Sequence, residues 1–202
     1  KTLLSRLHGI WGVGQVARKN PQVLATLKNL INDKEIEVRT NLIRVMGDAA
    51  YTPAVTDLIN VLKADPSMRV RSLAAIAIGK LKTPDAISPL IDLAIQNADK
   101  DPWLRHSLVM GLVGSASKKP ELLTTLANHV NRSARIVALL ALRRLAHPST
   151  AAFLKDSDQK IVTEVARAIH DDYAIPAVLP ALANSLNRTD ITNAAFIRRA
   201  IN

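Results

Sequence analysis

Apolar residues recur along the chain with the spacing of helices that bury one side. Three aspartates mark successive copies of this pattern: Asp33, Asp65 and Asp99. An apolar or small residue follows each of them at offsets of 5, 9, 12 and 13 residues, from Val38 to Met46 in the first copy. Because these offsets differ by three, four, seven and eight residues, the side chains share one face of an α-helix. Each aspartate precedes its helix, where a carboxylate can accept backbone N–H groups that have no helical partner.

A second apolar segment precedes most of these helices and begins with proline. Such segments are expected at 21–31, 53–62, 84–95, 120–130 and 176–186, with a very short one at 148–154. Proline at the first helical position costs nothing, because that N–H group has no helical partner. The repeating unit is therefore a helix pair, with a proline-opened helix A, an aspartate-containing turn and a helix B. Self-similarity at a period near 30 residues predicts a stacked solenoid.

This order of proline, aspartate, Val-Arg and a small residue in helix B resembles HEAT repeats. The resemblance covers essentially all of residues 1–202, in roughly six to seven repeats. It implies an all-α fold, a right-handed α-α superhelix of the HEAT/armadillo type, and a single domain over 1–202. We also expect a fragment of a longer protein, because the chain starts without Met and ends inside a helix predicted at 195–202.

Three strings indicate a closer resemblance: SRLHGIW at 5–11, DPWLRH at 101–106 and LALRRL at 140–145. They are similar to the HEAT segment of large bacterial multidomain proteins described as membrane-bound dehydrogenases or haem-binding proteins. In that family the segment connects a β-propeller domain and a c-type cytochrome domain. The resemblance implies flanking domains of the same chain as partners and a periplasmic or cell-envelope location.

Composition excludes several kinds of chemistry. The chain has no cysteine, which removes disulfides, thiolate metal sites and C-x-x-C-H haem attachment from it. No nucleophile elbow or phosphate-binding loop is present; Gly9, Gly12 and Gly14 lack the preceding strand of a dinucleotide fingerprint, and we expect them to let two helices approach closely. The longest apolar run, 136–142, is too short to span a bilayer. We therefore expect no catalytic residue, no cofactor and no metal.

Charge suggests anionic partners. The net charge is +10 and the isoelectric point about 10.2, which favours nucleic acid, acidic protein or anionic lipid. The arginines concentrate in the B helices, which usually line the concave surface of HEAT-like solenoids.

An arginine lies six residues after each of the three aspartates, which we call the reference aspartates. Looser copies of the repeat place an arginine at the same offset, one with His129 in place of the aspartate and one in which the chain starts inside the repeat. We call this set the arginine ladder: Arg6, Arg39, Arg71, Arg105 and Arg135. The ladder could bind phosphate or carboxylate groups of a ligand. Alternatively, each arginine pairs with an aspartate of its own or an adjacent repeat, such as Asp33, Asp65 or Asp99. We favour this pairing, because arginine and aspartate recur at a fixed offset, which a ligand site does not require.

Two further residues are candidate contacts. Trp103 is one of only six aromatic residues, as is Trp11. A solvent-facing tryptophan can anchor a partner, but Trp103 follows Pro102 at a helix start, and we expect it to pack over the adjoining turn. His106 lies beside Arg105 and near two aspartates, so a metal or axial haem role is conceivable, without the spacing of a histidine metal motif.

Three classes of function remain open. A non-catalytic scaffold or connector that contacts proteins or flanking domains fits the repeat best. Nucleic-acid binding, as in HEAT-like DNA glycosylases, has the charge in its favour and the scarcity of stacking aromatics against it. An enzyme, such as a HEAT-like lyase that attaches chromophores, rests on fold analogy alone.

Overall fold

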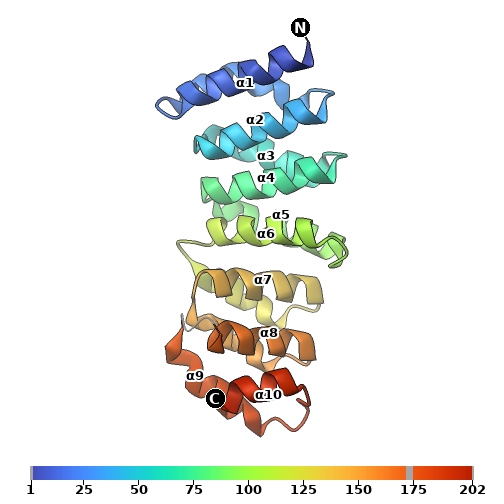
Figure 1. Ribbon diagram of the computed structural model, residues 1–202, viewed down its shortest axis with the longest axis vertical. Helices are drawn as coiled ribbons and strands as arrows, with labels where there is room; N and C mark the ends of the chain where they lie inside the picture. Colours follow the sequence, from blue (N-terminus) through green and yellow to red (C-terminus); the bar gives the residue numbers. More distant parts are fainter. Residues whose placement is uncertain (1, 172–174, 202) are drawn as a thin grey trace. The chain divides into compact units, whose positions relative to one another are not determined.

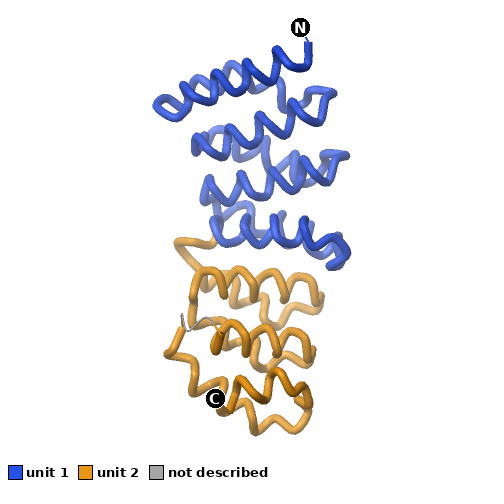
Figure 2. Tube along the Cα trace, viewed as in Figure 1, with its two compact units in different colours: residues 1–115 blue, residues 116–202 orange. Residues whose placement is uncertain are grey.

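The structure is a computed structural model that describes residues 2–171 and 175–201 (Figure 1). The described residues form helices joined by turns, with no strand among them. They divide into two compact units, residues 1–115 and 116–202 (Figure 2). Within the described ranges, no helix combines the length and hydrophobicity needed to cross a bilayer. The single domain expected over 1–202 stays a prediction.

Unit 1 consists of two layers of helices. The helices of one layer lie side by side in Figure 1 and are the predicted B helices: α1 (Leu3–Ala17), α2 (Ile36–Asp48), α4 (Met68–Leu81) and α6 (Pro102–Ser115). The A helices lie behind them: η1 (Pro21–Asn32), η2 with α3 (Thr52–Ala54 and Val55–Ala64), and η3 with α5 (Pro84–Ala86 and Ile87–Asn97). The proline at the start of each A helix is the one that the sequence predicts.

The predicted packing face of the B helices forms the core of unit 1. Side chains at offsets 5, 9 and 13 are at most 2% exposed in three successive helices: Val38, Leu42, Met46; Val70, Ala74, Ile78; Leu104, Leu108, Leu112. Burial of one large aliphatic side chain contributes about 1.5–3 kcal/mol. Each helix pair alone would leave this face in water, so the stacking of neighbouring repeats stabilises the unit.

Glycines bring α4 and α6 into backbone contact. A Cβ atom on Gly114 would lie 1.9 Å from the carbonyl oxygen of Gly79, and one on Gly79 would lie 2.6 Å from the carbonyl oxygen of Met110. In α1, the expected close approach is found only at Gly14, where a Cβ would lie 3.0 Å from Val45. For Gly9 and Gly12 the expectation is wrong, because a Cβ atom added to either glycine would have no neighbouring atom within 4 Å.

Unit 2 repeats the same arrangement with shorter elements. Its B helices are α7 (Arg132–Arg144), α8 (Gln159–His170) and α10 (Ala194–Ile201). The other elements are η4 (Pro120–Asn128), η5 (Pro148–Lys155), η6 (Pro176–Val178), α9 (Leu179–Asn184) and η7 (Ser185–Asn187). The core again follows the predicted face, with Ala134, Ala138, Ala141, Ile161, Val165 and Ile169 fully buried.

Three of the predicted A helices are 3₁₀ helices: η1, η4 and η5. Runs of this type longer than three or four residues are uncommon, yet η1 has 12 residues. In or beside each of the three, a threonine hydroxyl donates to the carbonyl three residues earlier: Thr26 to Val23, Thr125 to Leu122 and Thr150 to His147. That carbonyl spacing is the one a 3₁₀ helix uses, so these side chains favour the tighter turn.

Candidate functional site

Arg39 on α2 shows how a ladder arginine is used. Its Nε and Nη2 atoms donate to the two carboxylate oxygens of Asp65 at 2.7 and 3.0 Å, and its Nη1 donates to the backbone carbonyl of Asp33 at 2.7 Å. Asp65 also accepts the backbone N–H of Ser67 at 2.8 Å. The two charged side chains are only 8% and 6% exposed. The pair therefore joins the turns of two successive repeats inside the stack.

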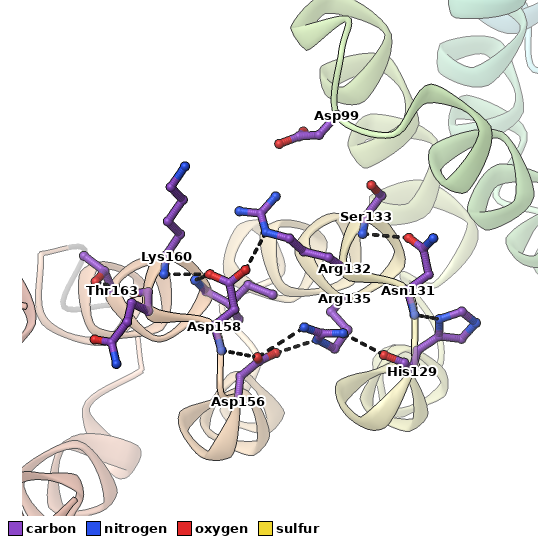
Figure 3. Close-up of polar contacts among 12 residues, drawn as sticks. Asp99, His129, Asn131, Arg132, Ser133, Arg135, Asp156, Asp158, Lys160 and Thr163 are labelled. Atoms are coloured by element: carbon purple, nitrogen blue, oxygen red, sulfur yellow. Dashed lines mark hydrogen bonds and ion pairs between the residues drawn. The ribbon is translucent and has the colours of Figure 1, made fainter. Parts of the chain in front are cut away.

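Three other ladder arginines also pair with aspartate: Arg6 with Asp33, Arg105 with Asp99, and Arg135 with Asp156. In unit 2, the Arg135 Nε atom lies 2.6 Å from Asp156 Oδ2, and its Nη1 donates to the His129 carbonyl at 2.9 Å (Figure 3). This arrangement repeats that of Arg39. The predicted ion pairs are thus present at four of the five ladder positions, within the same repeat for Arg105 and with the next repeat for the others.

Arg71 departs from the expected aspartate pairing. Its Nε donates to the Leu62 carbonyl at 2.6 Å and its Nη2 to Gln96 Oε1 at 3.3 Å. Burial lowers the pKa of its guanidinium, which nearby Asp65 partly offsets. The step from Asp65 to the next reference aspartate is two residues longer than the step before it. Gln96, in the last turn of α5, accepts the hydrogen bond that an aspartate accepts from Arg39.

Two of the reference aspartates, Asp33 and Asp65, accept backbone N–H groups in the turn before the helix rather than at the helix end itself. Asp33 accepts the backbone N–H of Glu35 at 2.9 Å, and this bond, followed by that from Arg6, lowers the pKa of its carboxyl group. Other carboxylates cap the helices. Asp101 accepts two N–H groups at the start of α6, at 2.8 and 3.1 Å, and Asp158 accepts two at the start of α8. The expected interaction with free N–H groups at a helix start is made by Asp101 and Asp158, whereas Asp33 accepts the N–H of the residue directly before α2.

Trp103 and His106 lie on the exposed side of α6. The Trp103 side chain is 81% exposed, so the prediction that it packs over the adjoining turn is wrong. Its backbone N–H is held by Asp101, and this bond fixes the first helical turn while the indole extends into solvent. Across the described part of the chain, no group of three or more His, Cys, Asp or Glu side chains is placed to hold a metal ion.

Trp103 belongs to a row of exposed apolar side chains that sequence analysis missed. We call it the first-turn row: Leu4, Ile36, Met68 and Trp103, which are 59%, 43%, 49% and 81% exposed. Each is the first or second residue of a B helix of unit 1. The four B helices begin at the same edge of the layer (Figure 1), so the first turns that carry these residues follow one another along that edge. The signal was available, since each of the four lies two or three residues before a ladder arginine.

Hollows beside the ion pairs arise from the stacking of turns. One of about 590 Å³ lies beside Arg39 and Asp65, and one of about 320 Å³ lies beside Arg135 and Asp156. The same hollow accompanies the same ion pair in both units. Its guanidinium groups are already bonded to aspartate and to backbone carbonyls, so they offer little to an anionic ligand.

Comparison with known proteins identifies the family. The family model of HEAT repeats matches residues 23–112 and 55–146. Among solved structures, the complex of CpcE and CpcF of phycocyanin lyase from Nostoc sp. PCC7120 is similar at 21% identity, over 98% of this chain and 88% of that one, with a TM-score of 0.55. YibA of Escherichia coli is similar at 17% identity, over 95% of this chain and 72% of that one, with a TM-score of 0.43. No curated protein matches the sequence.

The family matches together span more than half of the 202 residues. They agree with the two-layered helix pairs of the structure. The predicted all-α superhelical class is confirmed, and the chain belongs to the HEAT-repeat proteins.

Proposed function

We propose that the chain is a non-catalytic scaffold or connector that binds a protein, or flanking domains of its own chain, through the exposed side of the B helices in unit 1. The first-turn row carries this proposal. Exposed apolar side chains gathered on one surface mark interaction sites more often than scattered ones do, and tryptophan is enriched among the residues that anchor such sites. Here the row ends on Trp103, whose side chain is 81% exposed.

The arginine ladder favours a protein partner over nucleic acid. Four of its members are bonded to aspartates, so a phosphate group would have to displace a carboxylate to reach them. On the surface of α2 and α4, basic side chains alternate with acidic ones, because Arg69 pairs with Glu37 and Lys80 with Asp48. A continuous basic stripe, which is the usual footprint of a nucleic-acid surface, is interrupted there.

The resemblance to bacterial dehydrogenase- and cytochrome-type proteins suggests a more specific role. Two of the strings that carry it, at 5–11 and 101–106, contain the tryptophans of the chain, and both are exposed, at 45% and 81%. We propose that in such a parent protein this segment spaces and contacts the flanking domains, while the redox chemistry takes place in those domains.

Selection of binding peptides tests the proposal. Random peptides displayed on phage are selected on the immobilised chain and then tested on two double variants. Met68→Ala with Trp103→Ala shortens the first-turn row, and Leu122→Ala with Val130→Ala removes two exposed apolar side chains from unit 2 as a control. We expect peptides whose binding weakens in the first variant and persists in the control.

Two results would contradict the proposal. One is the absence of any enriched peptide. The other is micromolar binding of short duplex or single-stranded DNA that weakens steeply between about 50 and about 200 mM salt, which is the signature of phosphate contacts.

A further inference from the structure

A groove of about 420 Å³ lies between α1 and α2, outside the first-turn row. We call it the Trp11 groove. Its lining includes Trp11 and Gly14 from α1, Arg18 directly after that helix, and Asn41, Arg44 and Val45 from α2. Trp11, Gly14 and Val45 form its apolar part. The volume falls within the range of small ligand sites, about 300–1,000 Å³, and is enough for one or two side chains of a peptide.

Trp11 is exposed but held in a defined orientation. Its indole Nε1 donates to Asn41 Oδ1 at 2.9 Å, and the Asn41 amide is itself fixed by donating to the Glu37 carbonyl at 2.7 Å. The His8 ring lies against the indole, with ring centroids 5.4 Å apart and a tilt of 45°. The side chain nevertheless remains 45% exposed. An aromatic surface that is already ordered loses little entropy when a ligand covers it.

Two arginines at the groove are free for a ligand. Arg18 and Arg44 are exposed, and neither guanidinium takes part in a hydrogen bond or ion pair with the described residues. This distinguishes them from the ladder arginines, which are bonded to aspartate. The acidic side chain at the groove, Asp48, is paired with Lys80. The groove therefore has unneutralised positive charge beside an apolar surface.

We propose that the Trp11 groove binds a short acidic peptide segment of the partner protein, with one apolar side chain packed on Trp11 and Val45 and carboxylates bonded to Arg18 and Arg44. This inference rests on the proposed function, because it names the chemistry of the partner that such a scaffold binds. Guanidinium groups bond carboxylates in a two-pronged geometry that gives both strength and orientation. Gln15, whose amide has no partner among the described residues, can bond the peptide backbone at the same groove.

The charge pattern around the groove favours a peptide over a nucleic acid. A polyphosphate backbone carries a charge at every step, whereas the groove offers only two unpaired arginines, because the neighbouring Arg69 and Lys80 are already paired with Glu37 and Asp48. A peptide can place its few carboxylates on the two arginines and an apolar residue between them. Electrostatic complementarity of this local kind favours one ligand over others.

The experiment uses the full chain and random peptides displayed on phage. Peptides selected on the wild type are measured on Arg18→Ala with Arg44→Ala and on a control, Arg144→Ala with Arg198→Ala. The control removes two arginines of unit 2 whose guanidinium groups bond no other described residue, so the change in net charge is the same. The indole N–H signals of the two tryptophans, recorded by NMR, report which of them the peptide covers.

We expect the enriched peptides to carry acidic residues next to an apolar one. Their affinity should fall about tenfold or more in the groove variant, because the peptide carboxylates lose their charge-assisted hydrogen bonds to both guanidinium groups. Binding to the control should change less than about threefold. The Trp11 indole signal should shift, and a Trp11→Ala variant that keeps its helical circular dichroism should bind weakly.

Other outcomes separate this proposal from the proposed function. Peptides that lack acidic residues, or that bind the groove variant and the control equally, would overturn the groove as their site. If those peptides still depend on Met68 and Trp103, the scaffold function stands without the groove. If no peptide is enriched, or if DNA alone binds with strong salt dependence, both proposals fail.

Discussion

Replacing Arg39 by methionine should destabilise unit 1 more than any exposed arginine substitution. The change removes the two bonds to Asp65, at 2.7 and 3.0 Å, and the bond to the Asp33 carbonyl, at 2.7 Å. The carboxylate of Asp65 would keep the N–H of Ser67 as a partner. Because that side chain is only 6% exposed, water cannot readily replace the lost guanidinium.

The size of the effect follows from burial. Removing one partner of a buried ion pair costs about 3–5 kcal/mol, because the other charge is left without compensation. Methionine keeps much of the apolar stem of arginine in place, so we expect the lower end, about 3 kcal/mol. Adding Asp65→Asn removes the stranded charge and keeps an acceptor for Ser67. The double variant should therefore be more stable than Arg39→Met by about 1 kcal/mol or more.

Urea unfolding followed by circular dichroism measures these differences. The matched control is Arg69→Met, which breaks the ion pair between Arg69 and Glu37. These two side chains are 58% and 42% exposed. Exposed pairs contribute about 0–1 kcal/mol. If Arg39→Met destabilises the protein no more than Arg69→Met, the ladder does not hold the repeats together in the way we describe.

Three further predictions concern other parts of the stack. Gly79→Ala should destabilise the protein by about 1–3 kcal/mol, since its Cβ would lie 2.6 Å from a carbonyl oxygen of α6. Gly12→Ala should stabilise it by roughly 0.5–1 kcal/mol, because no atom lies within 4 Å of the added Cβ. Equal shifts in the melting temperatures of the two variants would refute this packing. Ala141→Asp, at a fully buried position, should cost several kcal/mol, and a wild-type melting temperature would contradict the repeat frame. The hydrogen bond from Arg199, then that from His170, lowers the pKa of Asp171 to about 2 from 3.8. This carboxylate therefore stabilises the folded state fully at pH values above its pKa in the unfolded chain, and the stabilisation is lost as pH falls through about 2. NMR titration should show the pKa of Asp171 rising in Arg199→Gln, and an unchanged pKa would rule out this pair.

The periodic positions of the B helices could be predicted because burial alone determines them. Val38, Leu42 and Met46 have the helical spacing and are all fully buried. The pairing of Arg39 could also be predicted, since arginine and aspartate recur at a nearly constant offset in successive repeats. In both cases a local sequence pattern carries the information, and its recurrence in successive repeats makes it recognisable.

Features that depend on one particular contact could not be predicted. Trp103 looked like a packing residue from its neighbours, but the turn offers it no surface and its indole remains in solvent. Left-handed backbone at Ala50, Lys82 and Ala146, with φ of 50°, 55° and 50°, ends B helices without the glycine that usually indicates such a position. The Trp11 groove forms only where two helices pack together, and its residues Trp11 and Asn41 are 30 residues apart in the sequence. No local motif indicates that contact.

A crystal structure of the chain bound to a selected peptide tests the central claim most directly. We expect the peptide on the exposed side of the B helices of unit 1, with Arg39 still bonded to Asp65. A ligand held instead by the ladder arginines, with their ion pairs to aspartate broken, would contradict the division between arginines that stabilise the stack and surfaces that bind the partner.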